Sequence, residues 1–147
     1  MTHMFLAFSL SLLMAVPMIT LERTTCFGTC PAYTLTIFDD GKVVFEGKEF
    51  VKQTGKAEGQ ITKAELAQLV RQFERINYMK LEDEYGMGDR CPDLWTDYPS
   101  AITSFTTNGA TKRINHYLGC RGLTILDQLT ALENKIDEVA NAQRWIK

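Results

Sequence analysis

Charged residues are absent from the first 21 positions of this sequence, and in the rest of it neither sign of charge predominates. Over 147 residues, 16 lysines and arginines oppose 18 aspartates and glutamates, which gives a formal net charge of −2. The basic residues are scattered along the chain. Because proteins that bind nucleic acid carry clustered positive charge, we expect no nucleic acid among the partners.

Catalytic motifs are also missing. Ser100 and Ser104 lack the flanking glycines of a G-x-S-x-G nucleophile turn. The cysteines form neither the C-x-x-C pair of a redox motif nor the paired spacing of a four-thiolate zinc site. The sequence therefore favours a protein that is not an enzyme and that has no cofactor and no bound metal, and it does not identify a specific activity.

Repeats, linkers and low-complexity tracts are absent, and 45% apolar with 23% charged residues is typical of one globular domain. A chain of this length buries roughly two-thirds of its unfolded surface on folding, so it needs no metal to form a core. We expect a terminal segment over residues 1–18 and a single domain over residues 19–147.

The longest apolar run in the sequence covers residues 4–16 and ends at Pro17. As a helix it would reach about 20 Å, which is short of a bilayer core and typical of a signal peptide. Extended to Leu21 it becomes a marginal transmembrane helix, and the poor cleavage motif around Ala15 would favour retention. A buried element of a cytosolic protein, or a true start at Met18, is the alternative. The side chains expected to face lipid are Met4, Phe5, Leu6, Phe8, Leu10, Leu12, Leu13 and Val16.

Four cysteines, an even number, indicate disulfide bonds and an oxidising compartment. Three pairings are possible. We favour Cys26 with Cys30, because Gly28 between them lets the chain fold back, and Cys91 with Cys120. A zinc site and a redox-active thiol pair remain as alternatives. Together with the apolar run, the cysteines place the protein in the cell envelope, on the periplasmic side of the cytoplasmic membrane, anchored or secreted.

Alternating apolar and polar residues predict strands, and apolar residues at helical spacing predict helices. The strands are expected at residues 19–24, 32–38, 42–46, 50–51, 100–107 and 112–118, with hairpin turns at residues 39–41 and 108–109. A capping box of Thr62 and Glu65 predicts a helix over residues 62–77, and Thr124 with Asp127 predicts a last helix whose end Trp145 and Ile146 hold in place. The fold class is therefore α+β. It consists of an antiparallel sheet of about five to six strands with two helices packed on one face, preceded by the apolar segment.

The irregular stretch over residues 80–97 is the leading candidate for a binding surface, because long loops in compact domains are often functional. Its acidic residues do not match a calcium loop, so we interpret them as solvated charges. Its aromatic residues are of the kind enriched at binding surfaces. The favoured alternative for Trp95 is a place in the core beside Cys91. The candidate surface consists of Tyr85, Asp93, Trp95, Asp97 and Tyr98.

His116 is the one histidine that follows the apolar run. On its predicted strand it shares a face with Ile114 and Leu118. A buried histidine satisfied by one hydrogen bond is therefore favoured over a general base or a metal ligand.

Several short motifs together resemble a family of bacterial domains of unknown function. The matching elements are Cys26-Phe-Gly-Thr-Cys30-Pro31-Ala-Tyr33, Asp40-Gly41, Trp95-Thr96-Asp97-x-Pro99, His116-Tyr117-x-Gly119-Cys120 and Arg144-Trp145-Ile146. The similarity covers roughly residues 19–147. It implies an exported or lipid-anchored single domain and no particular activity, and this sequence departs from a lipid-anchored pattern because no lipobox cysteine follows the apolar run.

The functional hypothesis is a non-enzymatic, exported or membrane-anchored accessory or binding domain, such as a small subunit of a bacterial membrane protein complex. Its partner would be a membrane-associated protein, and the apolar segment would contact the membrane. The alternative is a periplasmic protein that handles metals or performs thiol-dependent redox chemistry.

Overall fold

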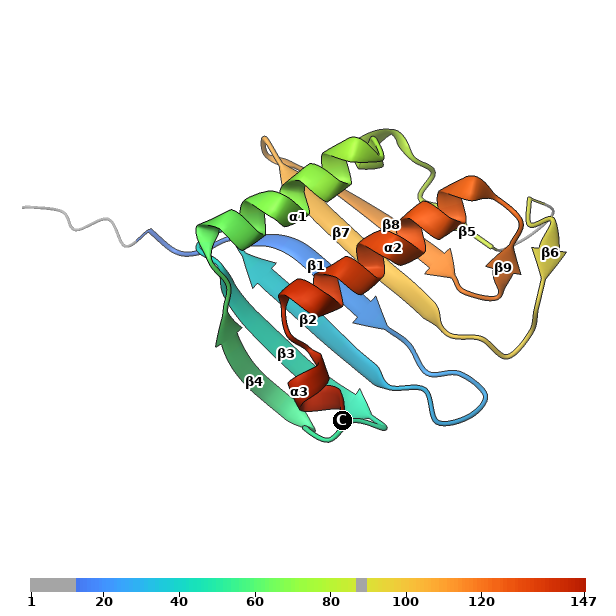
Figure 1. Cartoon of the computed structure of the whole chain (residues 1–147), viewed down its shortest axis with the longest axis horizontal. Coiled ribbons are helices and arrows are strands. Elements are labelled where there is room, and N and C mark those ends of the chain that lie inside the picture. The colour runs from blue at the N-terminus through green and yellow to red at the C-terminus, as the bar shows by residue number, and fades with distance from the viewer. Residues whose placement is uncertain (1–12, 87–89) are drawn as a thin grey trace, which may run out of the picture.

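The computed structural model describes residues 13–86 and 90–147, and it consists of a large sheet with two long helices lying across one face (Figure 1). The predicted α+β class and the two helices on one face are confirmed. The sheet has seven strands rather than five or six. The predicted membrane-facing residues Met4, Phe5, Leu6, Phe8, Leu10 and Leu12 lie outside the described residues.

Antiparallel pairing dominates the sheet, whose strand order is β4-β3-β2-β1-β7-β8-β5. Only β5, at one edge, runs parallel to its neighbour β8 within the described part of the chain. β6 and β9 pair separately. In chain order the strands are β1 (Pro17–Arg23), β2 (Ala32–Phe38), β3 (Lys42–Glu49), β4 (Gly55–Gln60), β5 (Glu84–Tyr85), β6 (Asp93–Leu94), β7 (Ser100–Thr107), β8 (Ala110–Tyr117) and β9 (Cys120–Arg121).

Alternation explains how the central strands build the core. Along β1 and β2 every second side chain points at the helices, so Ile19, Leu21, Leu35 and Ile37 are fully buried. The turn into β3 requires Gly41, whose φ is 85° and whose missing Cβ would meet the Ile61 carbonyl oxygen.

The prediction of a strand at residues 50–51 is wrong. Phe50 has a φ of 54° and lies in a bend, and the fourth strand is β4, at Gly55–Gln60. This strand forms an edge of the sheet and pairs only with β3, so its side chains are mostly polar and exposed. A polar edge strand gives no alternating apolar signal.

The helices follow the predicted pattern with one difference at a cap. Thr62 and Glu65 form the expected capping box at the start of the first helix. The last long helix starts at Thr124, but its N-cap is Leu123, which makes no side-chain capping bond. The helices are α1 (Lys63–Arg75), the 3-10 turn η1 (Tyr78–Lys80), α2 (Thr124–Val139) and the short α3 (Gln143–Ile146).

Trp145 lies in the separate short helix α3, because α2 ends at Val139, so it holds the end of the chain against the sheet rather than the end of the last long helix. Its ring stacks on Phe45 of β3, with 5.1 Å between ring centroids. The carbonyls of Trp145 and Ile146 accept hydrogen bonds from the backbone that follows β3.

The start of β1 corrects the proposed extension of the apolar helix to Leu21. Pro17 to Leu21 are part of the central strand β1, and Ile19 and Leu21 lie in the hydrophobic core. Leu13 and Val16 precede it in a non-helical, exposed segment. In the described ranges, no helix is long and apolar enough to cross a membrane.

Candidate functional site

Two disulfides tie together the loops at one end of the sheet, where β1 and β8 end and β2 and β7 begin. Cys26 pairs with Cys30 and Cys91 pairs with Cys120, with 5.7 Å between the Cα atoms in each bond. The favoured pairing is therefore confirmed. The backbone N–H of Phe27 donates to the carbonyl oxygen of Asp97 at 3.3 Å, so the first disulfide loop lies beside the loop that follows β6.

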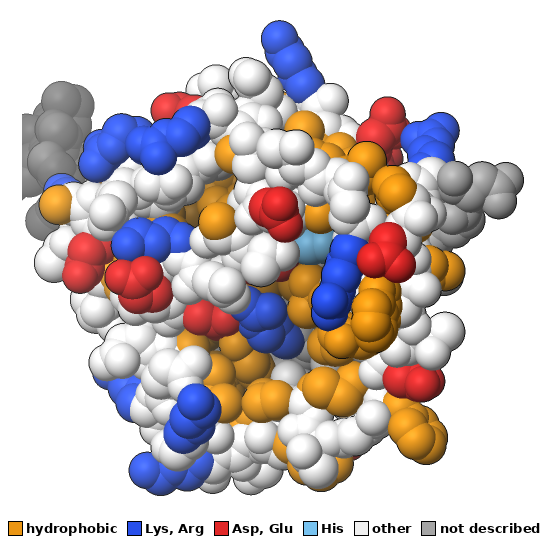
Figure 2. All heavy atoms as spheres, turned by 45° about the vertical axis from the view of Figure 1, so that its right-hand side comes forward, with side chains coloured by type: hydrophobic (Ala, Val, Ile, Leu, Met, Phe, Trp, Pro, Cys, Tyr) orange, Lys and Arg blue, Asp and Glu red, His pale blue; other side chains and the backbone are white. Residues whose placement is uncertain are grey.

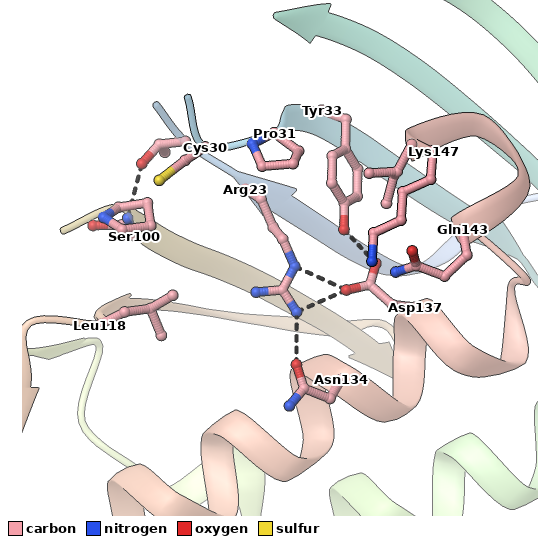
Figure 3. A pocket seen from close by; sticks show the side chains of 13 residues that line it. Arg23, Cys30, Pro31, Tyr33, Ser100, Leu118, Asn134, Asp137, Gln143 and Lys147 are labelled. Atoms are coloured by element: carbon pink, nitrogen blue, oxygen red, sulfur yellow. Dashed lines mark hydrogen bonds and ion pairs between the residues drawn. The ribbon is translucent and has the colours of Figure 1, made fainter. Parts of the chain in front are cut away.

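A pocket with a volume of about 320 Å³ opens at this end of the molecule, between the first disulfide loop and α2 (Figure 3). We call it the Arg23 pocket. Its lining combines polar side chains with an apolar wall. The lining residues are Arg23, Thr24, Cys30, Pro31, Tyr33, Pro99, Ser100, Leu118, Asn134, Asp137, Gln143, Ile146 and Lys147.

Arg23, the last residue of β1, is held in the pocket by α2. Its Nε and Nη2 lie 2.8 Å and 2.7 Å from Oδ2 of Asp137, and Nη2 also donates to Asn134 Oδ1 at 3.1 Å. The hydroxyl of Tyr33 donates to the other oxygen of Asp137 at 2.7 Å. One carboxylate therefore fixes both the guanidinium and the phenol (Figure 3).

This ion pair is largely shielded from water, since the side chains of Arg23 and Asp137 are 18% and 12% exposed. Burial alone would lower the pKa of Arg23, but the charge of Asp137, its hydrogen bond, and the nearby Tyr33 and Glu133 together outweigh burial, so the pKa lies above its ordinary value. Burial and the same carboxylate raise the pKa of Tyr33. The guanidinium stays charged and the phenol stays protonated at physiological pH.

His116 lies on β8, deeper in the core, and pairs with Glu133, one helical turn before Asp137 on α2. His116 Nδ1 and Glu133 Oε1 are 2.7 Å apart, and the two side chains are 2% and 1% exposed. This contact and burial confirm the prediction of a buried, hydrogen-bonded histidine. A general base must come within hydrogen-bond reach of its substrate, and the burial of His116 opposes such contact.

Glu133 is the more unusual member of this pair. Its Oε2 is buried and has no hydrogen-bond partner among the described residues. Burial raises the pKa of Glu133 above its ordinary value, and the hydrogen bond with His116 opposes this rise.

A second group, which we call the Trp95 cluster, consists of Trp95, Tyr98 and Arg121. The guanidinium carbon of Arg121 lies 5.0 Å from the Trp95 ring centroid and 5.2 Å from that of Tyr98, and its Nη2 donates to the Tyr98 hydroxyl at 2.9 Å. Trp95 is 50% exposed and Tyr98 38%, so the favoured core position of Trp95 is wrong. The reason is that Trp95 Nε1 donates to exposed Asp93 and the ring stacks on Arg121 instead of on the core.

The Trp95 cluster and the Arg23 pocket adjoin each other, because Pro99 and Ser100 follow Tyr98 directly and line the pocket. Figure 2 turns the β6 and β9 side of the molecule forward and shows hydrophobic side chains gathered there beside basic ones. Of the predicted surface residues, Asp93 and Asp97 are exposed in the same loop, whereas Tyr85 on β5 is half-buried against the core.

The acidic residues of the loop are dispersed. Asp83 pairs with Lys112, and Glu82 lies 3.6 Å from Arg90. Asp89 lies outside the described residues. Over residues 13–86 and 90–147, no three His, Cys, Asp or Glu side chains gather in a way that could hold a metal ion.

Sequence reasoning missed the central residues of the pocket, Arg23 and Asp137. A signal for one of them was present. Glu133 and Asp137 are four residues apart within the apolar stripe of α2 that contains Leu129 and Ile136, and buried acids in such a stripe require partners. The sequence around α2 does not show which residues those partners are.

Comparison with known proteins confirms the resemblance to a family of domains of unknown function. None of the curated proteins matches the chain. The model of one family matches residues 17–140, which include the described CFGTCP-x-Y, WTD-x-P and HY-x-GC motifs but not the closing Arg144-Trp145-Ile146. The chain therefore belongs to the family described as a domain of unknown function, DUF6438.

Proposed function

We propose that this chain is an exported bacterial domain that binds a protein partner, without catalysis of its own, through the end of the sheet that holds both disulfides. The observation that carries the proposal is the Trp95 cluster. Two large aromatic side chains are partly exposed there on a loop that Cys91–Cys120 ties to the domain, and exposed Arg121 of β9 lies against both rings. Such side chains dominate the binding energy of protein interfaces.

The occupant of this surface is expected to be a protein with an apolar centre and residues of both charges around it. The Trp95 cluster offers an aromatic area with the exposed guanidinium of Arg121 against it, and the exposed carboxylates of Asp93 and Asp97 lie around it in the same loop. Complementary charge at the rim of an interface directs association and selects partners. A membrane-associated protein of the cell envelope fits the apolar run over residues 4–16, which would deliver the domain to that membrane.

The disulfides support the location. All four cysteines are paired, and such bonds persist in oxidising compartments such as the bacterial periplasm. Mass spectrometry of alkylated, unreduced chain from its own cell envelope tests this, with no labelled thiol expected. Four labelled thiols would contradict the proposal and would favour the alternative of a thiol-dependent redox or metal-handling protein.

Site-specific photo-crosslinking in intact cells tests the binding surface. A photo-reactive residue at Tyr98 is expected to form an adduct with one protein, and the matched position Phe50, an exposed aromatic residue after β3, is not. The adduct should be lost in Trp95→Ala and retained in Met79→Ala, which removes a partly exposed side chain elsewhere. Equal adducts from Tyr98 and Phe50, or an adduct that survives Trp95→Ala, would contradict the proposal.

A further inference from the structure

The first disulfide loop presents an aromatic side chain to solvent. Phe27 is 88% exposed, more than any other aromatic residue that the structure describes. A single exposed apolar side chain is common in soluble proteins, so its support and its neighbours decide whether it has a role. We propose that Phe27, held in place by the Cys26–Cys30 bond, inserts into an apolar pocket of the protein partner. This inference rests on the proposed function, because it names a further contact of the same surface.

The loop that carries Phe27 is fixed to the chain beside it. Thr24 N–H donates to the Ser100 carbonyl oxygen at 3.0 Å, and Ser100 N–H donates to the Thr24 hydroxyl oxygen at 2.8 Å. Phe27 donates its own backbone N–H to the carbonyl oxygen of Asp97. The main chain of Phe27 is therefore held by the domain, while its ring remains exposed.

The disulfide makes this loop stiffer. Cys26–Cys30 closes a loop of four positions around Phe27. Gly28 has a φ of 150°, a conformation that favours glycine, and its N–H donates to the Cys26 carbonyl oxygen at 3.0 Å. A residue whose backbone is ordered before binding loses less conformational entropy when the partner binds. The loop is therefore preorganised to let a partner bury the phenyl ring of Phe27, which is a favourable transfer from water.

Phe27 adjoins the Trp95 cluster. Asp97, which accepts its hydrogen bond, lies in the sequence between Trp95 and Tyr98, and Leu94 is also exposed in that loop. Two separate loops thus bring exposed apolar side chains to one end of the sheet. Because the residues that dominate interface energy cluster together, one partner can contact Phe27 and the Trp95 cluster at the same time.

The charges around Phe27 favour a protein pocket over a lipid surface. No residue over 24–31 is charged, and Arg23, which precedes the loop, is paired with Asp137. Segments that lie on anionic membranes combine apolar residues with exposed lysine or arginine. An uncharged loop instead fits a pocket that is itself apolar and uncharged.

The direction of β1 places this contact away from the apolar run. That run joins β1 at Pro17, and the disulfide loop follows Arg23 at the other end of the strand (Figure 1). Seven residues of strand span about 20 Å. The pocket for Phe27 is therefore expected on an extramembrane part of a cell-envelope protein.

Photo-crosslinking of the full chain in intact cells tests the contact. A photo-reactive phenylalanine analogue at position 27 should form an adduct with the same protein as the probe at Tyr98. Phe27→Ala should lower the yield of the Tyr98 adduct about tenfold or more, since truncation of an anchor removes much of the binding energy. Phe27→Leu keeps an apolar side chain and should retain most of the yield. Thr29→Ala, an exposed substitution in the same loop, is the matched control and should not change it.

A second variant tests the support of the ring. Cys26→Ser combined with Cys30→Ser keeps Phe27 but opens the loop, so the yield of the Tyr98 adduct should also fall. The proposal is overturned if position 27 gives no adduct with that protein, if Phe27→Ala and Thr29→Ala give equal yields, or if the double variant keeps the full yield. A Tyr98 adduct that survives Phe27→Ala leaves the proposed function in place.

The lipid alternative is tested with vesicles of phosphatidylethanolamine and phosphatidylglycerol. The wild-type chain and Phe27→Ala should sediment with the vesicles to the same extent, because Phe27 contacts a protein. Weaker sedimentation of Phe27→Ala would assign the ring to the bilayer and overturn the proposal.

Discussion

Asp137 accepts hydrogen bonds from two different strands, since Arg23 is on β1 and Tyr33 is on β2. Asp137→Ala would leave the guanidinium largely buried without its anion, and removing one partner of a buried pair costs roughly 3–5 kcal/mol. We expect a loss near the lower limit, because Arg23 keeps 18% exposure. Urea unfolding measures it. The control Tyr33→Phe removes one hydrogen bond and should cost about 1 kcal/mol. Equal losses in the two variants would show that the ion pair contributes little.

Glu133 should make stability depend on pH. Because burial raises its pKa above the ordinary 4.5, its contribution is fully present below that value and is lost as pH rises through the raised pKa. Glu133→Gln can still bond His116 but cannot ionise, so its stability should fall less over this range. The charges of Arg23 and Asp137 also act on the Glu133 carboxyl, since Arg23 lowers its pKa and Asp137 raises it.

The measurement is the free energy of unfolding of wild type and Glu133→Gln at a series of pH values. Glu46→Gln, an exposed substitution on β3, serves as the control and should follow the wild type. Parallel curves for the wild type and Glu133→Gln would contradict the assigned role of burial.

The candidate site could be predicted from the sequence only where its signals are local. Trp95 and Tyr98 stand out because aromatic residues in an irregular acidic loop are unusual. Arg23 and Asp137 are 114 positions apart. Arg23 alone looks like an ordinary surface charge, and the place of Asp137 in the apolar stripe of α2 indicates that it needs a partner but not which one. Their pairing depends on the strand order, which brings the end of β1 under α2.

At the level of single elements, the start of α1 is set by its capping box. Glu65 N–H donates to the Thr62 hydroxyl oxygen at 3.1 Å, and the Glu65 carboxylate accepts from Thr62 N–H at 2.7 Å. Thr62→Ala should therefore lower the free energy of unfolding by about 1 kcal/mol in urea titrations. Thr124→Ala, at the first turn of α2, should have little effect because α2 has no side-chain cap. A larger loss in Thr124→Ala would contradict this assignment.

The Cys91–Cys120 bond should stabilise the domain more than Cys26–Cys30, because it closes a loop of 29 positions rather than 4. Replacing Cys91 and Cys120 with alanine should cost roughly 2–5 kcal/mol, and replacing Cys26 and Cys30 should cost less. Thermal unfolding of the oxidised variants compares the two. An unchanged melting temperature in the first variant would contradict the expectation.

Most elements could be predicted because their own side chains specify them. β2 and β7 alternate clearly, and α1 has both a cap and an apolar stripe. β4 could not be predicted, since of its six residues only Ala57 and Gly59 are partly buried. β5, β6 and β9 have two residues each, and their conformation is determined by the neighbour with which they pair.

For the whole molecule, both disulfides lie outside the main core cluster, although Cys120 itself is buried. The main core cluster is formed by the sheet and the helices and contains no cysteine. Reduction should therefore leave the domain folded and loosen only one end of it. Hydrogen exchange should rise over residues 24–31 and 90–99, while β1, β2 and β7 stay protected. Loss of protection in all strands would show that the core depends on the bonds.

The central place of β1 has a consequence for the order in which the sheet is completed. β1 is the first described strand, yet it lies between β2 and β7, and Thr20 meets Ser104 across 84 positions. A chain emerging from the ribosome, or threaded through a translocation pore, pairs β1 with β2 early and leaves the other side of β1 open until β7 arrives. An unpaired strand edge is a template for aggregation. We therefore expect this protein to be most prone to aggregation while the chain is half synthesised.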